Sequence, residues 1–402
     1  MRLAIVSPYP PTITGIGQYG YHVSRALAQS GQFTRITVVA DTPRAAQQID
    51  TPEPIQVEPV WHPDRANTGW EILTFLKNLK PDLVWFNLDV SSFGRSPTAN
   101  VSGFLSPIAA QKMGIPTIVT MHQLVELADL RALKAPGGIF AMYGARFLTH
   151  FATRADVVCL TMRRYVDWLA PRHPQLPCLH IPIGAYHEPE LLAESATQEL
   201  LLFGMLSPYK GLEVLLEAFD RLQKTKYPNL RLTIAGSPHP RFPEYARELR
   251  QKLSGVQGIR WAGNIPEDQV RELFRQAQVT ILPYMTSVGA SSVLFQAAAW
   301  GRSVVASDLP ETQSMVRESG LEVTLFKRGD AESLYKAIST QLDSPELRHR
   351  QVQQNFAAIL RHQPEDTCRA YLQAFNLALE SRRSLKRIAI PVLQAQIPTE
   401  SV

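Results

Sequence analysis

Short β-branched runs alternate with amphipathic helical stretches along the first half of the chain. Near-continuous apolar strands separated by helices are typical of a parallel sheet that is covered on both faces. The sequence therefore predicts a doubly wound α/β domain. The expected strands are Leu3–Val6, Ile36–Ala40, Leu83–Asn87, Thr117–Met121, Val157–Thr161 and Leu179–Ile183.

The same alternation stops near residue 190 and then begins again. The segment from Ala185 to Thr197 has no clear period. Further strands are then expected at Leu200–Phe203, Arg231–Ala235, Ile259–Trp261, Val279–Pro283 and Ser303–Ala306. A chain of 402 residues is expected to form roughly two domains. We expect a first Rossmann-like domain at 1–188, a second at 196–363, a C-terminal helix at 364–381 that packs back on the first domain, and a poorly ordered tail at 382–402.

Composition excludes several classes of protein. Hydrophobic residues make up 45% of the chain and charged residues 19%, so the whole chain is expected to be neither disordered, collagen-like nor a coiled coil. The net charge of +5 is weak for this length, and we expect no nucleic-acid partner. The three cysteines lie far apart, which favours a reducing, cytoplasmic compartment. No run of about 18 apolar residues occurs, so membrane contact is expected to be peripheral.

A glycine-rich segment follows the first expected strand. Gly15, Gly17 and Gly20 satisfy the pattern G-x-G-x-x-G, and Asp41 ends the next strand, as in an NAD(P)-dependent oxidoreductase. However, Ser7–Thr14 separates the strand from the glycines, whereas a dinucleotide fingerprint places its first glycine at the strand end. The alternative is a loop whose backbone amides approach a phosphate or a sugar hydroxyl at a helix N-terminus. A strand-ending Asp also commonly starts a turn, which explains Asp41 without a ligand.

Two loops of the second domain carry candidate groups for binding an anion. Lys210 lies between a buried strand and an amphipathic helix, where a cation is a natural counter-charge for a diphosphate. The small-residue loop Ser287–Ser292 precedes a helix that begins near Ser291, and the N–H groups at a helix N-terminus hold an anion without a basic side chain. Simpler explanations are a solvated lysine and N-capping of the helix by Ser291.

The sequence motifs of this chain, and their order, resemble those of glycosyltransferase family 4, a group of retaining enzymes. The fold that this resemblance implies is the α/β GT-B fold, in which two Rossmann-like, doubly wound parallel-sheet domains face each other across a cleft. The resemblance covers most of the chain. It rests on the glycine loop at 15–20 and on IPTIVTMH (115–122), ADVVCLT (155–161), IPIGA (181–185), FGMLSPYKGLEVLLEAF (203–219), LTIAGS (232–237), IRWAGNIPEDQVRELFRQAQVTILPY (259–284) and GRSVVASDLPE (301–311).

The resemblance implies transfer of a sugar, expected to be a hexose, from a nucleoside-diphosphate sugar to an acceptor hydroxyl with retention at the anomeric carbon. The second domain would hold the nucleotide, and the first would supply the acceptor side for a glycan, lipid-linked or small-molecule acceptor. Lys210 would neutralise the leaving diphosphate and His122 would contact the donor sugar, so these two are the expected catalytic residues. The other expected donor-binding residues are Gly15, Gly17, Gly204, Gly289, Ala290, Ser291, Ser292 and Gln296.

Three positions depart from the family pattern. Members commonly carry Arg where this chain has Met205, and Glu where it has Val288 and Gln296. The Gln296 side chain still has hydrogen-bonding groups for a ribose, whereas that of Val288 has none. These departures allow two interpretations, a catalytically silent sugar-nucleotide-binding relative or an active branch in which backbone amides replace the acids. We favour the active branch, which the segments 208–211 and 290–293 fit.

A metal-independent reaction with no cofactor besides the donor is expected, because no Asp-x-Asp occurs in the sequence. The stretch 138–154 predicts a helix that fits an anionic membrane or a lipid-linked acceptor, at the inner membrane face of the cell. A core-packed helix with solvated cations explains the same pattern more simply. The aromatic residues of this stretch are Phe140, Tyr143, Phe147 and Phe151, and its basic residues include Arg146, His150 and Arg154.

Overall fold

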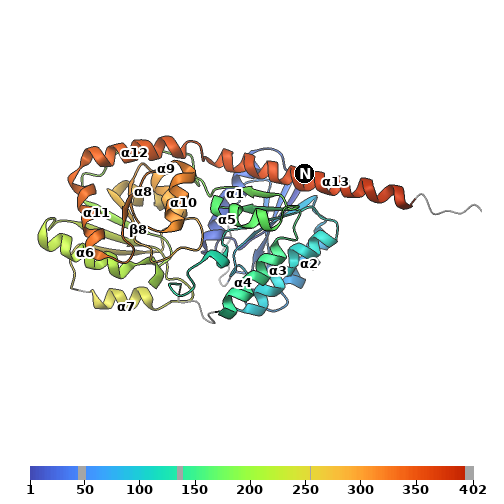
Figure 1. Ribbon diagram of the computed structural model, residues 1–402, viewed down its shortest axis with the longest axis horizontal. Coiled ribbons are helices and arrows are strands. Elements are labelled where there is room, and N and C mark those ends of the chain that lie inside the picture. The colour runs from blue at the N-terminus through green and yellow to red at the C-terminus, as the bar shows by residue number, and fades with distance from the viewer. Residues whose placement is uncertain (44–50, 134–138, 254, 394–402) are drawn as a thin grey trace, which may run out of the picture. The chain divides into compact units, whose positions relative to one another are not determined.

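The computed structural model describes residues 1–43, 51–133, 139–253 and 255–393, with the backbone alone at 139–141 and 384–393. The described residues group into two compact units, each with its own parallel sheet (Figure 1). This arrangement confirms the predicted fold of two Rossmann-like α/β domains. Unit 1 takes its described residues from Met1–Glu126, Met142–Pro182 and Glu365–Val402, and unit 2 from Leu127–Ala141 and Ile183–Pro364. Residues 127–133 group with unit 2, although they lie within the range expected for the first domain.

The sheet in the described part of unit 1 has seven strands in the order β3-β2-β1-β4-β5-β6-β7. The strand order reverses at β1, which pairs with β2 and β4, and ligands of such sheets bind at the carboxyl ends of the strands beside this point. The strands are β1 (Arg2–Val6), β2 (Arg35–Asp41), β3 (Ile55–Trp61), β4 (Leu83–Leu88), β5 (Thr117–Met121), β6 (Val157–Leu160) and β7 (Cys178–His180). The helices are α1 (Gly15–Gln29), α2 (Thr68–Leu79), α3 (Pro97–Lys112), α4 (Ile139–Ala152), α5 (Arg163–Leu169) and α13 (Pro364–Leu393).

The C-terminal helix α13 completes the core of unit 1. The ring centroid of Tyr371 is 4.5 Å from that of Trp85, and its hydroxyl is 2.9 Å from Thr120 Oγ1. Further along α13, Arg382 Nε forms an ion pair with the buried carboxylate of Asp156 at 3.0 Å. The helix was expected to end at 381 and to be followed by a tail at 382–402. In the structure, α13 instead continues to Leu393, and the contact of Arg382 lies within this additional part. Residues 394–402 of that tail lie outside the described residues.

The sheet of unit 2, as far as the structure describes it, has six strands in the order β10-β9-β8-β11-β12-β13, and its order reverses at β8. The strands are β8 (Glu199–Phe203), β9 (Arg231–Ala235), β10 (Ile259–Gly263), β11 (Val279–Leu282), β12 (Ser303–Ser307) and β13 (Thr324–Phe326). The helices are the 3-10 turn η3 (Pro208–Lys210), α6 (Leu212–Thr225), α7 (Tyr245–Lys252), α8 (Glu267–Gln276), α9 (Ser292–Ala299), α10 (Pro310–Ser319), α11 (Ala331–Asp343) and α12 (Pro345–Ile359).

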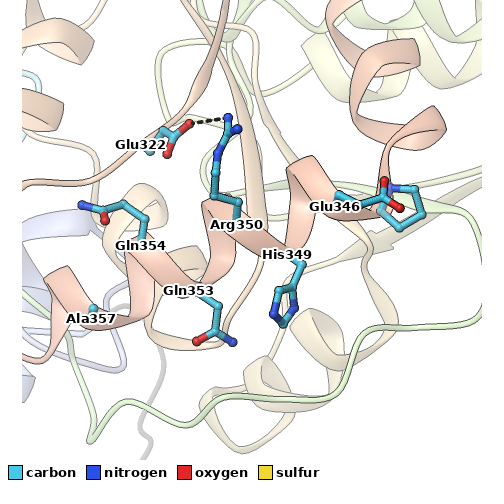
Figure 2. Close-up of a pocket in the computed structure, with 8 residues that line it drawn as sticks. Glu322, Glu346, His349, Arg350, Gln353, Gln354 and Ala357 are labelled. Carbon is cyan, nitrogen blue, oxygen red and sulfur yellow. Dashed lines mark hydrogen bonds and ion pairs between the residues drawn. The ribbon is translucent and has the colours of Figure 1, made fainter.

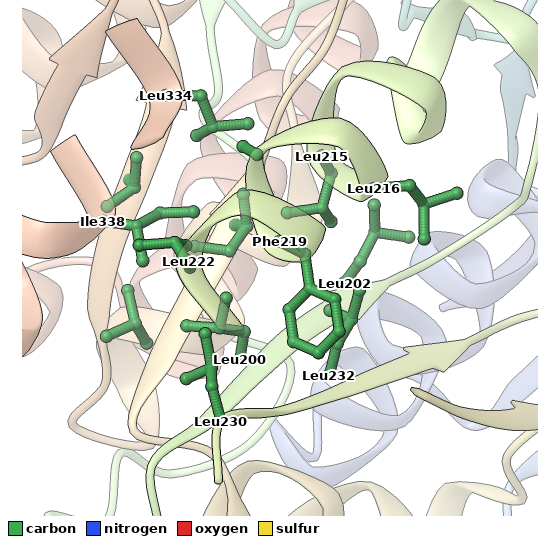
Figure 3. Close-up of a cluster of buried hydrophobic side chains, with 14 of the residues drawn as sticks. Leu200, Leu202, Leu215, Leu216, Phe219, Leu222, Leu230, Leu232, Leu334 and Ile338 are labelled. Carbon is green, nitrogen blue, oxygen red and sulfur yellow. The ribbon is translucent and has the colours of Figure 1, made fainter. Parts of the chain in front are cut away.

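Helix α6 packs its apolar side on the sheet and fixes the loop at its own N-terminus (Figure 3). Its apolar residues recur at intervals of three and four, which is the period of a helix with one buried face. Against them lie side chains of β8, β9 and α11. The buried set includes Leu215, Leu216, Phe219 and Leu222 of α6, Leu200 and Leu202 of β8, Leu232 of β9, and Leu334 and Ile338 of α11.

Candidate functional site

A short turn connects β8 to α6 and carries Lys210. The turn ends at Gly211, whose φ of 68° is in the left-handed region that favours glycine. A Cβ atom at Gly211 would lie 1.8 Å from the carbonyl oxygen of Pro283, just after β11. The Met285 N–H also donates to the carbonyl oxygen of Tyr209 at 2.8 Å. Glycine is therefore required for this turn to lie against the loop that follows β11.

The ammonium group of Lys210 lies over an aromatic ring. Its Nζ is 3.6 Å from the centroid of the ring of Tyr284, which is buried. Among the described residues, no carboxylate forms an ion pair with Lys210. Burial, followed by the positive charges of Arg241 and Lys210, lowers the pKa of His239 to about 4. The turn thus carries a cation without an acidic partner, in surroundings that are already positive.

The loop after β11 leads into α9 through small residues. Gly289 has a φ of 130°, which again favours glycine, and Ser291 occupies the N-cap position of α9. The side chain of Ser291 makes no capping hydrogen bond, and its Oγ instead lies 3.4 Å from the hydroxyl of Tyr284. The hydroxyl of Ser292 hydrogen-bonds with Tyr186. Side-chain capping by Ser291, the simpler explanation of this serine, is therefore not what the structure shows, and the start of α9 keeps its capacity for an anion.

The end of β8 lies beside the start of α9. Gly204 follows β8 with a φ of 115°, and a Cβ atom there would meet only Val293 of α9, at 3.5 Å. The backbone of Gly204 also touches that of Gly236, because a Cβ atom at Gly236 would lie 1.8 Å from the Gly204 carbonyl oxygen. Gln296 is buried in α9, and its carboxamide forms no hydrogen bond with the described residues. Sequence reasoning did not single out Gly236, although a glycine that ends a strand was the available signal.

The structure places the candidates of unit 2 around the carboxyl ends of β8 and β11. A lone cation, a helix N-terminus and closely packed glycines together form the kind of surface that binds a diphosphate. Within the described ranges, no three His, Cys, Asp or Glu side chains lie close enough together to hold a metal ion. The candidates at these strand ends are Gly204, Lys210, Gly289, Ala290, Ser291, Ser292 and Gln296, and the departing positions Met205 and Val288 lie in the same two loops, half-buried.

The two candidate glycines of unit 1 differ in what their surroundings require. Gly17 donates its N–H to Thr14 Oγ1, the N-cap of α1, at 2.9 Å. A Cβ atom at Gly17 would lie 2.8 Å from that oxygen and 3.2 Å from the carbonyl oxygen of Pro8, so packing disfavours a side chain there. A Cβ atom at Gly15 would meet no atom within 4 Å. The packing of the protein therefore explains Gly17 but leaves open space at Gly15.

Asp41 turns its carboxylate onto the loop that precedes the glycines. The carboxylate accepts a hydrogen bond from the N–H of Tyr9 at 3.1 Å and one from Thr12 Oγ1 at 2.6 Å. Burial raises the pKa of Asp41, and these hydrogen bonds oppose the increase. Both oxygens are engaged within the protein, which matches the turn-forming role of a strand-ending Asp and gives the ribose-binding role of an oxidoreductase no support.

His122 follows β5 and is almost completely buried. Its Nε2 lies 2.6 Å from Asn87 Oδ1, and the ring of Tyr19 packs edge-on against it with centroids 4.8 Å apart. Burial lowers the pKa of His122 to about 3, so the ring is neutral at ordinary pH. His122 is therefore a hydrogen-bonding group and not a cation for a phosphate. The sequence pattern did not point to Asn87, although a polar residue near the end of an apolar strand was visible.

A hollow on the surface of unit 2 lies along α12, apart from these candidates (Figure 2). Most of the residues that line it have polar or charged side chains, and they include an ion pair between Arg350 and Glu322 at 3.4 Å. His349 and Gln353 come from the same helix. None of the predicted site residues lines this hollow, and we assign it no role.

Two family models match the chain. The model described as "Glycosyl transferase 4-like domain" matches residues 14–178, from the N-cap of α1 to the first residue of β7. The model described as "Glycosyl transferases group 1" matches residues 197–344, which contain the candidates of unit 2. Together they account for most of the chain.

Curated relatives and solved structures agree with these models. D-inositol 3-phosphate glycosyltransferase of Acidothermus cellulolyticus is 28% identical over 315 residues, which cover 71% of this chain and 67% of that protein. Phosphatidyl-myo-inositol mannosyltransferase of Mycobacterium leprae is 31% identical over 156 residues, which cover 39% of this chain and 40% of that protein. The structure of Anabaena Alr3699/HepE in complex with UDP and glucose has a TM-score of 0.70 at 14% identity, covering 94% of this chain and 99% of that chain.

The two parallel sheets, the two family models and the solved structures identify a glycosyltransferase of the GT-B fold. The chain belongs to glycosyltransferase family 4, as its sequence resemblance predicted.

Proposed function

We propose that this protein transfers a hexose from a nucleoside-diphosphate sugar to a hydroxyl group of an acceptor, with retention of configuration at the anomeric carbon. The observation that supports this proposal best is the placement of Lys210. Its ammonium is held over the Tyr284 ring without a carboxylate partner among the described residues, in the turn after β8. A cation held in place before the donor binds needs no rearrangement as negative charge develops on a leaving diphosphate.

The proposed reaction breaks the bond between the anomeric carbon and the diphosphate oxygen, and forms a bond from that carbon to the acceptor oxygen on the same face. The acceptor proton passes to the departing diphosphate, so no protein nucleophile is required. Lys210 and the N-terminus of α9 supply the stabilisation that a metal ion supplies in other transferases. Metal independence is therefore part of the proposal, and the backbone of the loop at Gly289 takes the place of the acid missing at Val288.

A screen of donors by calorimetric titration tests this proposal. The structural relative from Anabaena is a complex with UDP and glucose, so UDP sugars head a series that includes GDP and ADP sugars. We expect the protein to bind a nucleoside-diphosphate sugar and to transfer its sugar to a hydroxyl acceptor. We also expect the protein to retain this activity in the presence of a chelator. Binding of NAD(H) or NADP(H) alone would contradict the proposal. Tight binding of a sugar nucleotide without turnover by any acceptor would indicate the silent relative instead.

A second part of the proposal concerns α4 and an anionic membrane surface. The expectation of a core-packed helix is wrong for two of its aromatic side chains, because Tyr143 is 58% and Phe147 is 49% exposed. The Arg146 guanidinium lies 5.9 Å from the Tyr143 ring centroid, and Nη2 of Arg154 lies 3.3 Å from Nε2 of His150. Gly138 and the side chain of Phe140 lie outside the described residues.

No helix within the described ranges combines the length and apolar character needed to cross a bilayer. An exposed helix side with aromatic and basic residues together fits peripheral binding to anionic lipid.

Replacing Arg146 and Arg154 together with glutamine is expected to weaken binding to vesicles that contain anionic lipid by roughly 30-fold. Each basic residue near such a surface contributes about 1 kcal/mol, and the two contributions add. Cosedimentation with anionic and with zwitterionic vesicles measures the effect. The matched control replaces Arg247 and Arg250 of α7 with glutamine, which removes the same charge from unit 2. Equal binding by both double variants would show that α4 is not the membrane-binding surface.

A further inference from the structure

One buried amide joins three strand ends of unit 1. Asn87, in β4, is completely buried. Its Nδ2 donates to Ser7 Oγ, just after β1, at 2.9 Å and to the carbonyl oxygen of Ile16 in α1 at 2.9 Å. Its Oδ1 lies 2.6 Å from Nε2 of His122, just after β5. The hydroxyl of Ser7 donates to the carbonyl oxygen of Pro8 at 2.7 Å.

The chemistry of these groups fixes the direction of every hydrogen bond in the network. A backbone carbonyl only accepts, so the hydroxyl of Ser7 must donate to Pro8 and the amide of Asn87 must donate to Ile16. The single hydrogen of the Ser7 hydroxyl is then used, and its oxygen accepts the second hydrogen of the amide. This arrangement leaves Asn87 Oδ1, a pure acceptor, facing the imidazole. His122 must therefore carry its proton on Nε2.

The proton on Nε2 decides what the other ring nitrogen of His122 offers. The ring is neutral because burial lowers the pKa of His122 to about 3, and no charged side chain contributes to that decrease. A neutral imidazole that is protonated on Nε2 has a lone pair on Nδ1. Nδ1 has no hydrogen-bonding partner among the described residues, and it is not one of their enclosed polar atoms. The ring thus presents an acceptor, and only an acceptor, to a ligand.

We propose that Asn87 is the positioning residue of His122: it holds the imidazole in the Nε2-protonated tautomer, so that Nδ1 accepts a hydrogen bond from a hydroxyl group of a sugar substrate. This inference rests on the proposed function. A sugar hydroxyl has a hydrogen to donate, whereas an ionised phosphate has none, so the tautomer selects the sugar and not the diphosphate. The bond from Asn87 to Ile16 also fixes the imidazole relative to the glycine loop, because Ile16 follows Gly15 directly.

The tautomer of His122 is measurable in the full-length protein without any substrate. Two-bond proton–nitrogen spectra of the ten histidines distinguish a protonated from an unprotonated ring nitrogen, and a His122→Gln variant identifies the signal of His122. We expect a protonated Nε2 and an unprotonated Nδ1 that stay unchanged from about pH 8 to about pH 5, where an ordinary histidine titrates. The opposite tautomer, or titration in this range, would overturn the inference whether or not a donor is found.

Replacing Asn87 with aspartate is expected to make sugar transfer depend on pH. A carboxylate still accepts the Nε2 proton, but its charge favours the imidazolium and raises the pKa of His122. Below the raised pKa, Nδ1 is protonated and no longer accepts. We therefore expect kcat/KM of the variant to decrease by roughly tenfold as the pH falls through that pKa, the size of one lost hydrogen bond, while the wild-type profile lacks this step.

Asn100 offers a matched control, since it is another buried asparagine of unit 1 with the same bonding pattern. Its Nδ2 donates to the carbonyl oxygens of Gly94 and Ser96, and its Oδ1 accepts from the N–H of Phe93. We expect Asn100→Asp to lower stability and to leave both the His122 signals and the pH profile unchanged. If Asn87→Asp behaves as Asn100→Asp does, Asn87 has a structural role only and the inference is wrong. Should Asn87→Asp not fold, the wild-type spectrum still decides.

Discussion

Replacing Lys210 with alanine is expected to reduce kcat of sugar transfer by roughly a hundredfold to a thousandfold. Removal of one preorganised group that faces developing negative charge has an effect of about this size. In the proposed reaction Lys210 is such a group, since its Nζ is held 3.6 Å from the Tyr284 ring centroid and no carboxylate of the described residues neutralises it. Since the chain has Met205 where relatives commonly have a second cation, little remains in this loop to compensate. Steady-state kinetics with the donor found by titration measure the loss.

Two further variants separate charge from general damage. Lys224 of α6 forms an exposed ion pair with Asp220 at 2.7 Å, and we expect Lys224→Ala to leave transfer unchanged. Lys210→Arg keeps the charge but replaces a compact ammonium with a planar group, and we expect it to recover part of the rate. Transfer by Lys210→Ala within about threefold of the wild-type rate would show that this lysine does not stabilise the leaving group.

The central strands of both sheets were predictable because parallel strands that are buried on both sides read as apolar runs. Two strands were not predicted, β3 and β13, and both lie at the edge of their sheet. Glu58 and Pro59 interrupt the apolar pattern of β3, and an edge strand tolerates them because one of its sides has no neighbour to bond. β13 has only three residues, Thr324–Phe326, too few to show a period.

The candidate site was predictable where it depends on local sequence and not where it depends on distant partners. The turn with Lys210 and the loop at Gly289 follow from strand–loop–helix patterns. By contrast, the ring beneath Lys210 belongs to Tyr284, on another loop, and the protonation of His122 follows from burial and from Asn87. Tertiary packing sets these properties, so no spacing along the chain reveals them.

Exposed aromatic residues of α4 show the same limit. The helical period of this stretch was visible, but the period alone does not say which side faces the protein. The structure buries Ala145 and Leu148 and leaves Tyr143 and Phe147 exposed, so small and aliphatic residues make the contact with the protein. A ranking of residues by hydrophobicity favours the aromatic side as the buried one, but such a ranking does not account for aromatic side chains that a protein exposes at a binding surface.

A Gly211→Ala substitution is expected to damage both stability and transfer. The φ of 68° at Gly211 disfavours any residue with a Cβ atom by about 1–2 kcal/mol. That Cβ atom would also lie 1.8 Å from the carbonyl oxygen of Pro283, so the turn must move away from the β11 loop. We expect the free energy of unfolding to decrease by roughly 2–5 kcal/mol in total. Because Lys210 precedes Gly211 directly, we expect the displaced lysine to lower transfer by roughly a hundredfold, which a shift of about 1 Å is enough to cause.

Gly31 provides the control that separates the two causes. It has the same φ of 68°, but a Cβ atom there would meet no atom within 4 Å. Gly31→Ala therefore places a Cβ atom in the unfavourable backbone conformation without a close contact. We expect its free energy of unfolding to decrease by about 1–2 kcal/mol and its sugar transfer to stay unchanged. Thermal unfolding and steady-state kinetics of both variants measure the difference. If Gly211→Ala were as mild as Gly31→Ala in both measurements, the contact between the turn and Pro283 would not be what holds Lys210 in place.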